Sequence, residues 1–246
     1  KAIRRQRQMC IRDRVFAVKG GDSMSVLQAE GWLEGLSHSA LRQIESQGRI
    51  RTYQAKSVIF IKGKPLMHYF FVAKGLVAVY RQNRDGKRWI ASLIGSETFF
   101  PHIGFEQPSA VYPANAEALT DCTLLAVRKV EMTRLMHDFS SLQDQLTRFF
   151  AEKSQELITR CSDSLLESAE HRLIQLLKQL ALQSAKRTDD GWYSVGDILT
   201  EENMADYIGV TQETVSRIMT RLYRDRIVRR SGRKKICLNL QRLTER

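Results

Sequence analysis

The stretch 199–227, LTEENMADYIGVTQETVSRIMTRLYRDRI, constrains the fold of this chain more than any other segment. Ala205 is small enough to let a second helix approach closely, and Gly209 can take the positive φ of a sharp turn between helices. Beyond the turn, apolar residues recur at i, i+3 and i+7, namely Val215, Ile218 and Leu222. This spacing gives the second helix one buried stripe and predicts two helices that cross at a tight turn.

The opposite face of the second helix is polar. Thr200 and Thr211 are placed to cap the two helices. A helix-turn-helix lays such a second helix in the DNA major groove. Any helical hairpin buries an apolar stripe, but here the small, apolar and polar positions are all in register, which favours DNA binding. The expected DNA-binding residues are Thr211, Gln212, Glu213, Thr214, Ser216, Arg217 and Arg221.

Positive charge begins within this second helix. Residues 217–246 hold eleven Lys or Arg against two acidic residues, whereas residues 187–216 hold one basic residue against seven acidic ones. Two short runs, 227–230 and 234–238, enclose a turn that contains Gly232, which predicts a β-hairpin. A merely solvated charge run is the common alternative, but beside a helix-turn-helix we expect a wing that contacts phosphates through Arg230, Arg233 and Lys234.

Between residues 49 and 127, short β-rich runs alternate with glycine-containing turns. Many short strands at this spacing are typical of a compact barrel or sandwich. Short helical patterns precede them within residues 22–46, so we expect a β-structured domain with flanking helices over 22–138. The runs are 50–53, 57–61, 68–72, 76–80, 89–94, 111–118 and 122–127.

From about residue 139 to 168 the pattern is helical, without a Gly or Pro. A long helix with one narrow apolar seam is best satisfied by pairing with a copy of itself, so the sequence predicts a homodimer. A second helix, from about 171 to 185, leads into the expected DNA-binding domain, 169–246. The seam consists of Leu146, Phe150, Ser154, Leu157, Cys161 and Leu165.

Composition limits the remaining alternatives. At 246 residues and 43% hydrophobic, the chain is long enough for two ordinary cores, and no apolar run reaches the length of a bilayer span. Cys10, Cys122, Cys161 and Cys237 lie far apart, so we expect a protein of the reducing cytoplasm without a disulfide framework or zinc cluster. Residues 1–14, with six basic residues and one acid, contribute to the net charge of +12. Residues 1–21 are expected to be an unstructured tail or a non-native extension.

The order of these parts resembles that of the cyclic-AMP receptor/fumarate-nitrate regulator (Crp/Fnr) family of bacterial transcription factors. The likeness runs from about Leu27 to Leu243 and is carried by YFFVAKGLVAVYRQNRDGKRWIASL and IGVTQETVSRIMTRLYRDRIVRRSG. It implies an α+β fold, with an N-terminal β-roll, a long dimerisation helix and a C-terminal winged helix-turn-helix. The implied partners are double-stranded DNA, a second copy of the chain and, for an activator, RNA polymerase.

The resemblance also implies base contacts. In the family, the glutamate at the position of Glu213 accepts from bases and the arginine at the position of Arg217 reads guanine. Guanidinium pairs bidentately with guanine O6 and N7, while a carboxylate can accept from cytosine N4. Ser216 matches the fumarate-nitrate branch, whereas Gln212 departs from the arginine of the cyclic-AMP branch, so a palindrome with TTGA-like half-sites is implied. The alternatives are a helix-dipole role for Glu213 and a phosphate contact for Arg217.

The likeness weakens where the family binds its ligand. Pro101-His102 stands where the cyclic-AMP branch has Gly-Glu, Tyr112-Pro113 where it has Arg-Ser, and Leu157-Ile158 where its dimer helix has a polar pair. Because no arginine is present for the cyclic phosphate, cyclic AMP is not the expected effector. If the protein has an effector pocket, the candidates to line it are His102, Tyr112, Leu157 and Cys161.

No cofactor is predicted. An iron–sulfur cluster needs four thiolates, and the N-terminal cysteine group of the family is missing. Haem ligation through His68, His102 or His137 stays open, although a packed or surface histidine is the commoner case. A redox role for Cys161 competes with that of a buried, inert thiol.

The sequence carries no pattern typical of an enzyme. It has no Gly-rich phosphate loop, no metal-spaced His, Cys and Asp group and no nucleophile with persuasive partners. The stronger alternative is a ligand-binding roll whose C-terminal helices bind protein, which predicts weak salt dependence with nucleic acid. We expect a homodimeric, sequence-specific transcription regulator that answers to an unidentified effector.

Overall fold

The computed structural model describes residues 27, 33–96, 98–105, 107–184, 186–187, 191–195, 199–231 and 235–244. The expected tail, 1–21, lies outside the described residues. Within them, no helix is both long and apolar enough to cross a bilayer.

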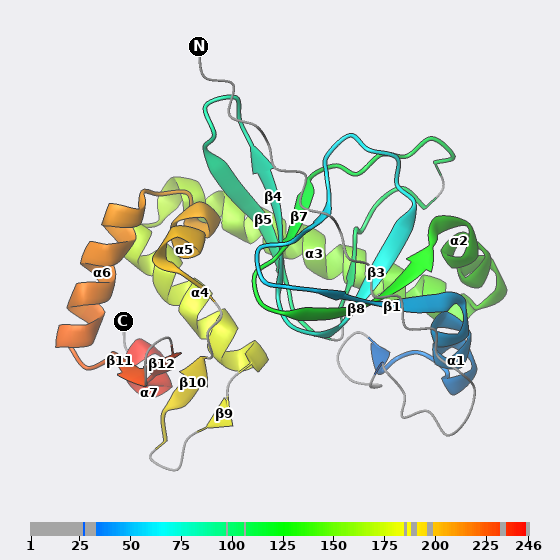
Figure 1. Ribbon diagram of the computed structural model, residues 1–246. Coiled ribbons are helices and arrows are strands. Elements are labelled where there is room, and N and C mark those ends of the chain that lie inside the picture. The colour runs from blue at the N-terminus through cyan, green and yellow to red at the C-terminus, as the bar shows by residue number, and fades with distance from the viewer. Residues whose placement is uncertain are drawn as a thin grey trace.

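The N-terminal half is a roll of two four-stranded sheets (Figure 1). One sheet has the order β1-β8-β3-β6 and the other β2-β7-β4-β5, with antiparallel pairing throughout. Two helices, α1 (His38–Gln47) and α2 (Lys129–Asp138), flank the roll. Its strands are β1 (Gly48–Tyr53), β2 (Val58–Phe60), β3 (His68–Lys74), β4 (Val77–Gln82), β5 (Arg88–Ile94), β6 (Phe99–Phe100), β7 (Asn115–Ala118) and β8 (Cys122–Arg128).

The strands agree with the predicted runs to within two residues at each end, except at the entrance to β7. The run 111–118 was expected to be one strand, but β7 begins only at Asn115 and Val111 forms an isolated bridge to Pro65. Pro113 lacks the N–H that a strand interior needs for its ladder. The two-residue strand β6 was not predicted, because its residues carry no alternating pattern.

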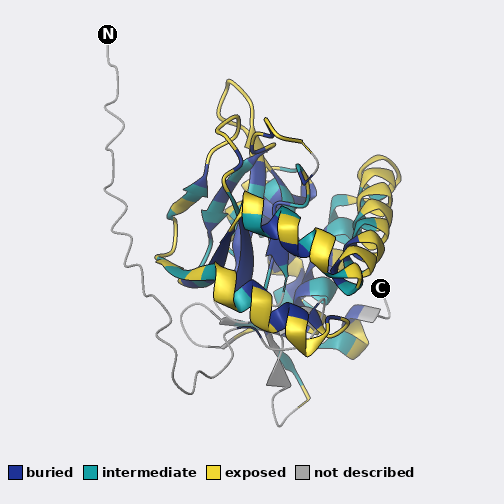
Figure 2. Cartoon of the chain, turned by 90° about the vertical axis from the view of Figure 1, so that its right-hand side faces the viewer, coloured by how far each residue is buried: buried dark blue, intermediate teal, exposed yellow. Residues whose placement is uncertain are grey.

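Helix α3 (Ser140–Leu166) follows the roll and splits the predicted apolar seam in two. Its first half packs on the roll through Leu142, Leu146 and Phe149, all buried. Its second half is largely exposed (Figure 2). Pairing with a second copy therefore cannot use Leu146, because that side chain is already buried within its own chain.

The C-terminal half contains three packed helices and a third sheet, of order β11-β12-β10-β9. The longest strands of this sheet have four residues. Its elements are α4 (Ala169–Ser184), β9 (Lys186–Arg187), β10 (Tyr193–Val195), α5 (Glu201–Ile208), α6 (Gln212–Arg224), β11 (Val228–Ser231), β12 (Lys235–Leu238) and the short α7 (Leu240–Thr244).

One apolar core joins the two halves. Leu76, Tyr80 and Ile90, from the hairpin of β4 and β5 and its approach, belong to the same buried cluster as residues of α4, α5 and α6. Helix α5 lies against β5 in consequence (Figure 1). The position of the helical domain is thus set by the face of the β4–β5 hairpin.

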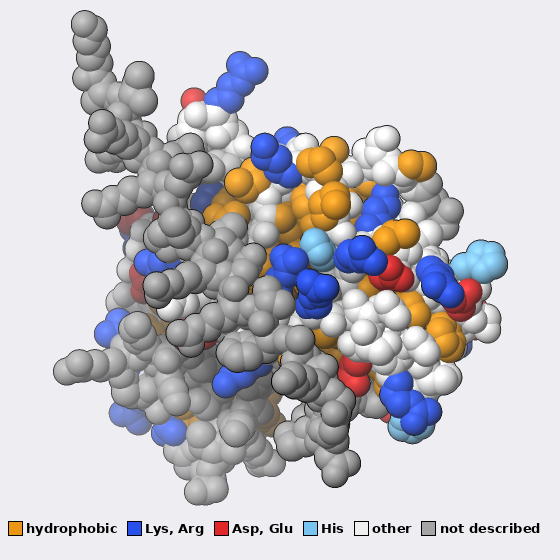
Figure 3. Space-filling view, turned by 45° about the vertical axis from the view of Figure 1, so that its right-hand side comes forward, with side chains coloured by type: hydrophobic (Ala, Val, Ile, Leu, Met, Phe, Trp, Pro, Cys, Tyr) orange, Lys and Arg blue, Asp and Glu red, His pale blue; other side chains and the backbone are white. Residues whose placement is uncertain are grey.

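The roll also carries apolar side chains on its surface. Large exposed residues include Ile61, Met67, Ile103 and Val111. Figure 3 shows hydrophobic side chains gathered on the described face beside Lys and Arg side chains.

Candidate nucleic-acid interface

Helix α5 begins and ends with the residues that the sequence predicted. The Thr200 hydroxyl accepts from the Asn203 N–H at 3.1 Å and caps its first turn. Gly209 ends it at φ 76° and ψ 34°, the left-handed region, with its N–H donating to the Ala205 carbonyl at 2.9 Å. Glycine adopts this conformation without a Cβ penalty, so the predicted positive φ at Gly209 is confirmed.

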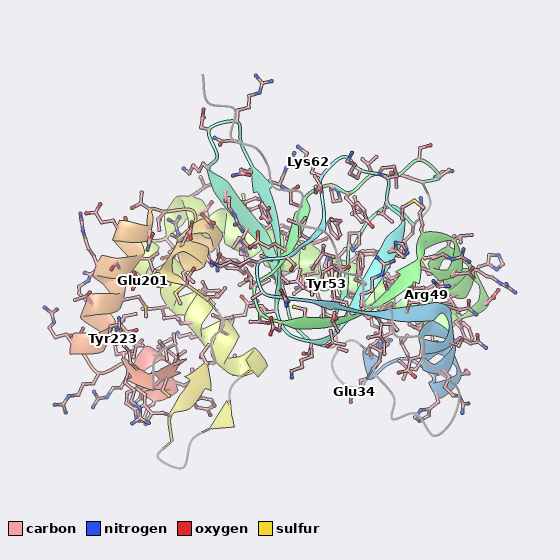
Figure 4. All side chains as sticks on the ribbon, viewed as in Figure 1. Glu34, Arg49, Tyr53, Lys62, Glu201 and Tyr223 are labelled. Atoms are coloured by element: carbon pink, nitrogen blue, oxygen red, sulfur yellow. The ribbon has the colours of Figure 1, made fainter. Side chains whose placement is uncertain are left out.

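Helix α6 presents one buried and one exposed face. The Thr211 hydroxyl accepts from the Thr214 N–H at 3.3 Å, which confirms the predicted N-cap. The buried stripe is also confirmed, and it contains one residue more than predicted: Val215, Ile218, Met219 and Leu222. Figure 4 shows nitrogen-tipped side chains that project from α6 and the region near Tyr223 into solvent.

The predicted contact residues divide by their surroundings. Gln212, Glu213 and Arg217 are exposed, and Ser216 is half-buried. Glu213 and Arg217 form an ion pair one helical turn apart, and each side chain is 74% exposed. Thr214 also shares a hydroxyl–hydroxyl contact of 2.9 Å with Thr211. The structure thus places a carboxylate and a guanidinium side by side at the start of α6.

Arg221 has a different environment from Arg217. Its guanidinium lies 2.8 Å from the carboxylate of Glu170 at the start of α4, and its side chain is half exposed. This ion pair ties α6 to α4 inside the domain. Arg224, which we did not predict as a contact, lies on the last turn of α6 with a side chain 74% exposed. Its single signal in the sequence is its charge within the basic stretch.

The predicted wing is present as the hairpin of β11 and β12. Arg230 is exposed, with its guanidinium 5.5 Å from the centre of the Tyr223 ring. Arg229 lies 4.5 Å over the Trp192 ring. Arg233 and Lys234, expected at the tip, lie outside the described residues. Of the three expected wing residues, Arg230 is the one that the structure places.

The interior of the roll is filled by aromatic side chains. Tyr112 stacks on Phe60, with ring centres 3.9 Å apart and planes at 6°. Its hydroxyl accepts from the His68 N–H and donates to the His68 carbonyl, both at 3.2 Å. A cyclic phosphate needs a cation here, whereas this position offers a buried phenol whose pKa is raised, chiefly by burial. The residues present therefore do not fit a cyclic nucleotide bound in the manner of the cyclic-AMP branch.

His102 is enclosed by aromatic rings. Its ring centre lies 5.3 Å from that of Phe99 and 4.6 Å from that of Phe149, and its Nε2 donates to the Phe99 carbonyl at 2.6 Å. Burial lowers the pKa of His102 to about 4. Ligation of a haem iron by Nε2 would require this hydrogen bond to break. Among the described residues, no group of three or more His, Cys, Asp or Glu is arranged to hold a metal ion.

The four residues proposed for one effector pocket lie in two places. His102 and Tyr112 belong to the roll interior, whereas Leu157 and Cys161 line an open groove of about 1410 Å³ between α3, α4 and the end of α5. Within one chain the four residues do not line a common cavity, and the effector pocket stays a prediction. Cys161 is exposed in the single chain, and its burial between two copies stays a prediction.

Comparison with known proteins agrees with this architecture. Residues 50–139 match the family model of the cyclic nucleotide-binding domain, and residues 171–246 match that of the Crp-like helix-turn-helix domain. The CRP-like cAMP-activated global transcriptional regulator of Mycobacterium tuberculosis is 21% identical over 221 residues, which cover 90% of this chain and 98% of that protein.

Two solved structures share the fold. The c-di-GMP-responsive global regulator CLP of Xanthomonas campestris has a TM-score of 0.70 at 15% identity, over 82% of this chain and 99% of that one. The structure of FixK2 from Bradyrhizobium japonicum has a TM-score of 0.69 at 21% identity, over 80% of this chain and 96% of that one.

A β-roll, a long connecting helix and a helix-turn-helix with an exposed, charged second helix define a DNA-binding transcription regulator. The two domain models match in the order that this architecture requires. The chain belongs to the Crp/Fnr family of regulators, as the resemblance in its sequence indicated.

The turn of the helix-turn-helix gives a direct stability prediction. Gly209→Ala should lower the free energy of unfolding by about 1–2 kcal/mol, because an L-residue pays this for the left-handed region. A Cβ at Gly209 would meet no atom within 4 Å, so the cost comes from the backbone alone. Urea unfolding followed by circular dichroism measures it.

Gly95→Ala is the matched control. A Cβ there also meets nothing within 4 Å, and its φ is not in the left-handed region. We expect no loss of stability, or a slight gain from the reduced entropy of the unfolded chain. Equal losses in both variants would contradict the assignment of strain to Gly209.

Proposed function

We propose that this regulator binds, as a homodimer, a palindromic operator with TTGA-like half-sites and that its effector is not cyclic AMP. The single observation that carries the proposal is the exposed Glu213–Arg217 pair on a capped α6. As an activator, the protein would also contact RNA polymerase.

The pair is suited to base reading because it is exposed and because separating its two side chains costs little free energy. An exposed ion pair contributes about 0.2–1 kcal/mol, whereas a good bidentate contact to guanine contributes about 1–3 kcal/mol of discrimination. DNA can therefore take Arg217 away from Glu213 at a net gain. Glu213 is then left to accept from a neighbouring base, and the exposed Gln212 lies beside it.

The second half of α3 supports self-association. Four large apolar side chains on it are between 47% and 79% exposed, which is unusual for one helix of a soluble domain. They are Leu157, Ile158, Leu165 and Leu166. Pairing of two such helices would bury them and hold two copies of α6 in one particle, as reading of two half-sites requires.

Filling of the roll interior supports an effector other than cyclic AMP. Tyr112 and Phe60 stack where the family's arginine would face a phosphate. The groove between α3, α4 and the end of α5 is lined by neither Tyr112 nor His102. A ligand of this roll would have to displace packed aromatic rings.

Arg217→Ala tests direct readout. We expect the variant to lose about 1–3 kcal/mol of discrimination at one base pair of the half-site, measured by titration of duplexes with single-base changes. Arg224→Ala removes the same charge from the same helix and should weaken all sequences alike, as a phosphate contact does. If Arg217→Ala also weakens all duplexes equally, base reading by this residue is wrong.

A substitution on α3 tests whether this helix holds the dimer together. Wild type should sediment at about twice its chain mass of 28.3 kDa, and Leu165→Glu should shift it toward the monomer. Leu165 is 79% exposed in the single chain, so its replacement should not unfold it. Val130→Glu, at an apolar residue of α2 that is 64% exposed, is the control and should leave the dimer intact. A monomeric wild type would refute the proposal.

Thermal melting tests the effector. Cyclic AMP at about millimolar concentration should leave the melting temperature unchanged, since a ligand that binds only the native state raises it in proportion to ln(1 + [L]/Kd). An operator duplex at excess should raise it and serves as the positive control. A rise with cyclic AMP would show that the aromatic interior opens for the nucleotide.

A further inference from the structure

The side chain of Arg160 extends from the exposed half of α3 and contacts two other elements. Its guanidinium donates to the backbone carbonyls of Ala91 and, at 3.0 Å, Ile90 in strand β5. It also donates to the carbonyl of Tyr207 in helix α5 at 3.2 Å. The roll, the long helix and the helix-turn-helix therefore meet at one side chain.

The local structure of β5 explains why two successive carbonyls face Arg160. β5 is an edge strand, and its pairing with β4 shifts from Val79↔Ser92 to Tyr80↔Ile90. Ala91 is the extra residue of this bulge. A bulge leaves its residue outside the ladder and disrupts the pairing around it, which makes the carbonyls of Ile90 and Ala91 available to an outside donor.

The contact with α5 has its own physical reason. Tyr207 lies in the last turn of α5, where carbonyls have no partner within the helix. The negative end of the helix dipole favours a cation there. The guanidinium also lies 3.9 Å over the Tyr207 ring and 5.8 Å over the Trp89 ring. The planar guanidinium directs its donors at the three carbonyls and also lies over both rings, whereas an ammonium is a point charge without this planar fork.

A second charged contact holds the same two elements. Arg88 of β5 lies 3.4 Å from the carboxylate of Asp206 in α5 and 3.6 Å from that of Glu117 in β7. It also lies 4.1 Å over the Tyr80 ring. The three charged side chains are between 16% and 22% exposed. Helix α5 is thus fixed to the roll by charge as well as by the apolar core.

We propose that Arg160 is the residue that positions the helix-turn-helix. Arg160 lies on α3, the helix expected to form the dimer, and its hydrogen bonds join α5 to the bulge of β5. We call this set of hydrogen bonds the clasp. The proposal rests on the proposed DNA-binding dimer. Leu157 and Cys161, on either side of Arg160 along α3, line the open groove together with Ile208 and Gly209. A movement of α3 is therefore passed to α5, and through the Gly209 turn to α6.

Two variants distinguish the effect of the directed hydrogen bonds of Arg160 from the effect of its positive charge alone. Arg160→Met removes every donor, and Arg160→Lys keeps the charge but not the planar fork. Arg148→Met removes an exposed charge from the same helix and is the control. Hydrogen exchange of the α5 amides reports the clasp without DNA. Binding to two duplexes with TTGA-like half-sites reports positioning: in one duplex the half-sites lie one DNA turn apart, about 34 Å, and in the other one half-site is moved by about half a turn.

We expect α5 amides to exchange about tenfold faster in both Arg160 variants and at the wild-type rate in Arg148→Met, since loss of hydrogen bonds to a charged group makes local opening of α5 easier. Wild type should prefer the one-turn spacing, and both Arg160 variants should lose this preference about tenfold or more. Because the clasp is a set of directed hydrogen bonds, Arg160→Lys should resemble Arg160→Met.

Two other outcomes overturn the inference. If Arg160→Lys behaves as wild type, charge alone suffices and the clasp is wrong. If exchange rises but spacing preference stays, Arg160 stabilises α5 without positioning the domain. If Arg160→Met does not fold, Arg160→Lys decides. Failure of wild type to bind any duplex would refute the proposed function instead, while hydrogen exchange would still decide the clasp.

Discussion

Burial of one face of the β4–β5 hairpin against α4 and α5 is the interaction on which the arrangement of this regulator depends. The sequence predicts two domains, but they do not have separate cores. The side chains of Tyr80 and Ile90 in the roll share a core with the helical domain. Since burial contributes about 25 cal/mol per Å², a continuous core resists separation of the halves. A helix-turn-helix attached in this way is held at a defined angle to the roll, not tethered by a loop.

Much of this could be predicted from local pattern. Gly209, Thr200 and Thr211 occupy positions where backbone geometry demands particular residue types, and such demands can be read within a few neighbours. The strands of the roll were found because glycine turns bound them. No strand forms at 111–114, because Pro113 has no N–H to donate to the ladder. This reason is visible in the sequence, but the prediction of one strand over 111–118 did not take it into account.

The remainder depends on contacts between distant residues. Arg160 bonds to carbonyls 69 and 70 residues earlier and to one 47 residues later. Every residue has a backbone carbonyl, so no sequence pattern could identify these three as the partners of Arg160. The α3 seam was misjudged for a related reason. A periodic stripe shows which residues are buried but not what covers them, and Leu146 packs on the roll while Leu165 stays exposed.

The two sets of arginine contacts differ in a way that suits the roles proposed for them. Arg217 and Glu213 form a pair 74% exposed on each side, which water and salt screen and which therefore breaks at little cost. Arg88 and Asp206 are 22% and 18% exposed, so removing one partner would leave a charge poorly hydrated. Separation of α5 from the roll thus costs more than rearrangement on α6. Because the joint is the stiffer of the two, DNA meets a surface whose side chains adapt while the helix beneath them keeps its place.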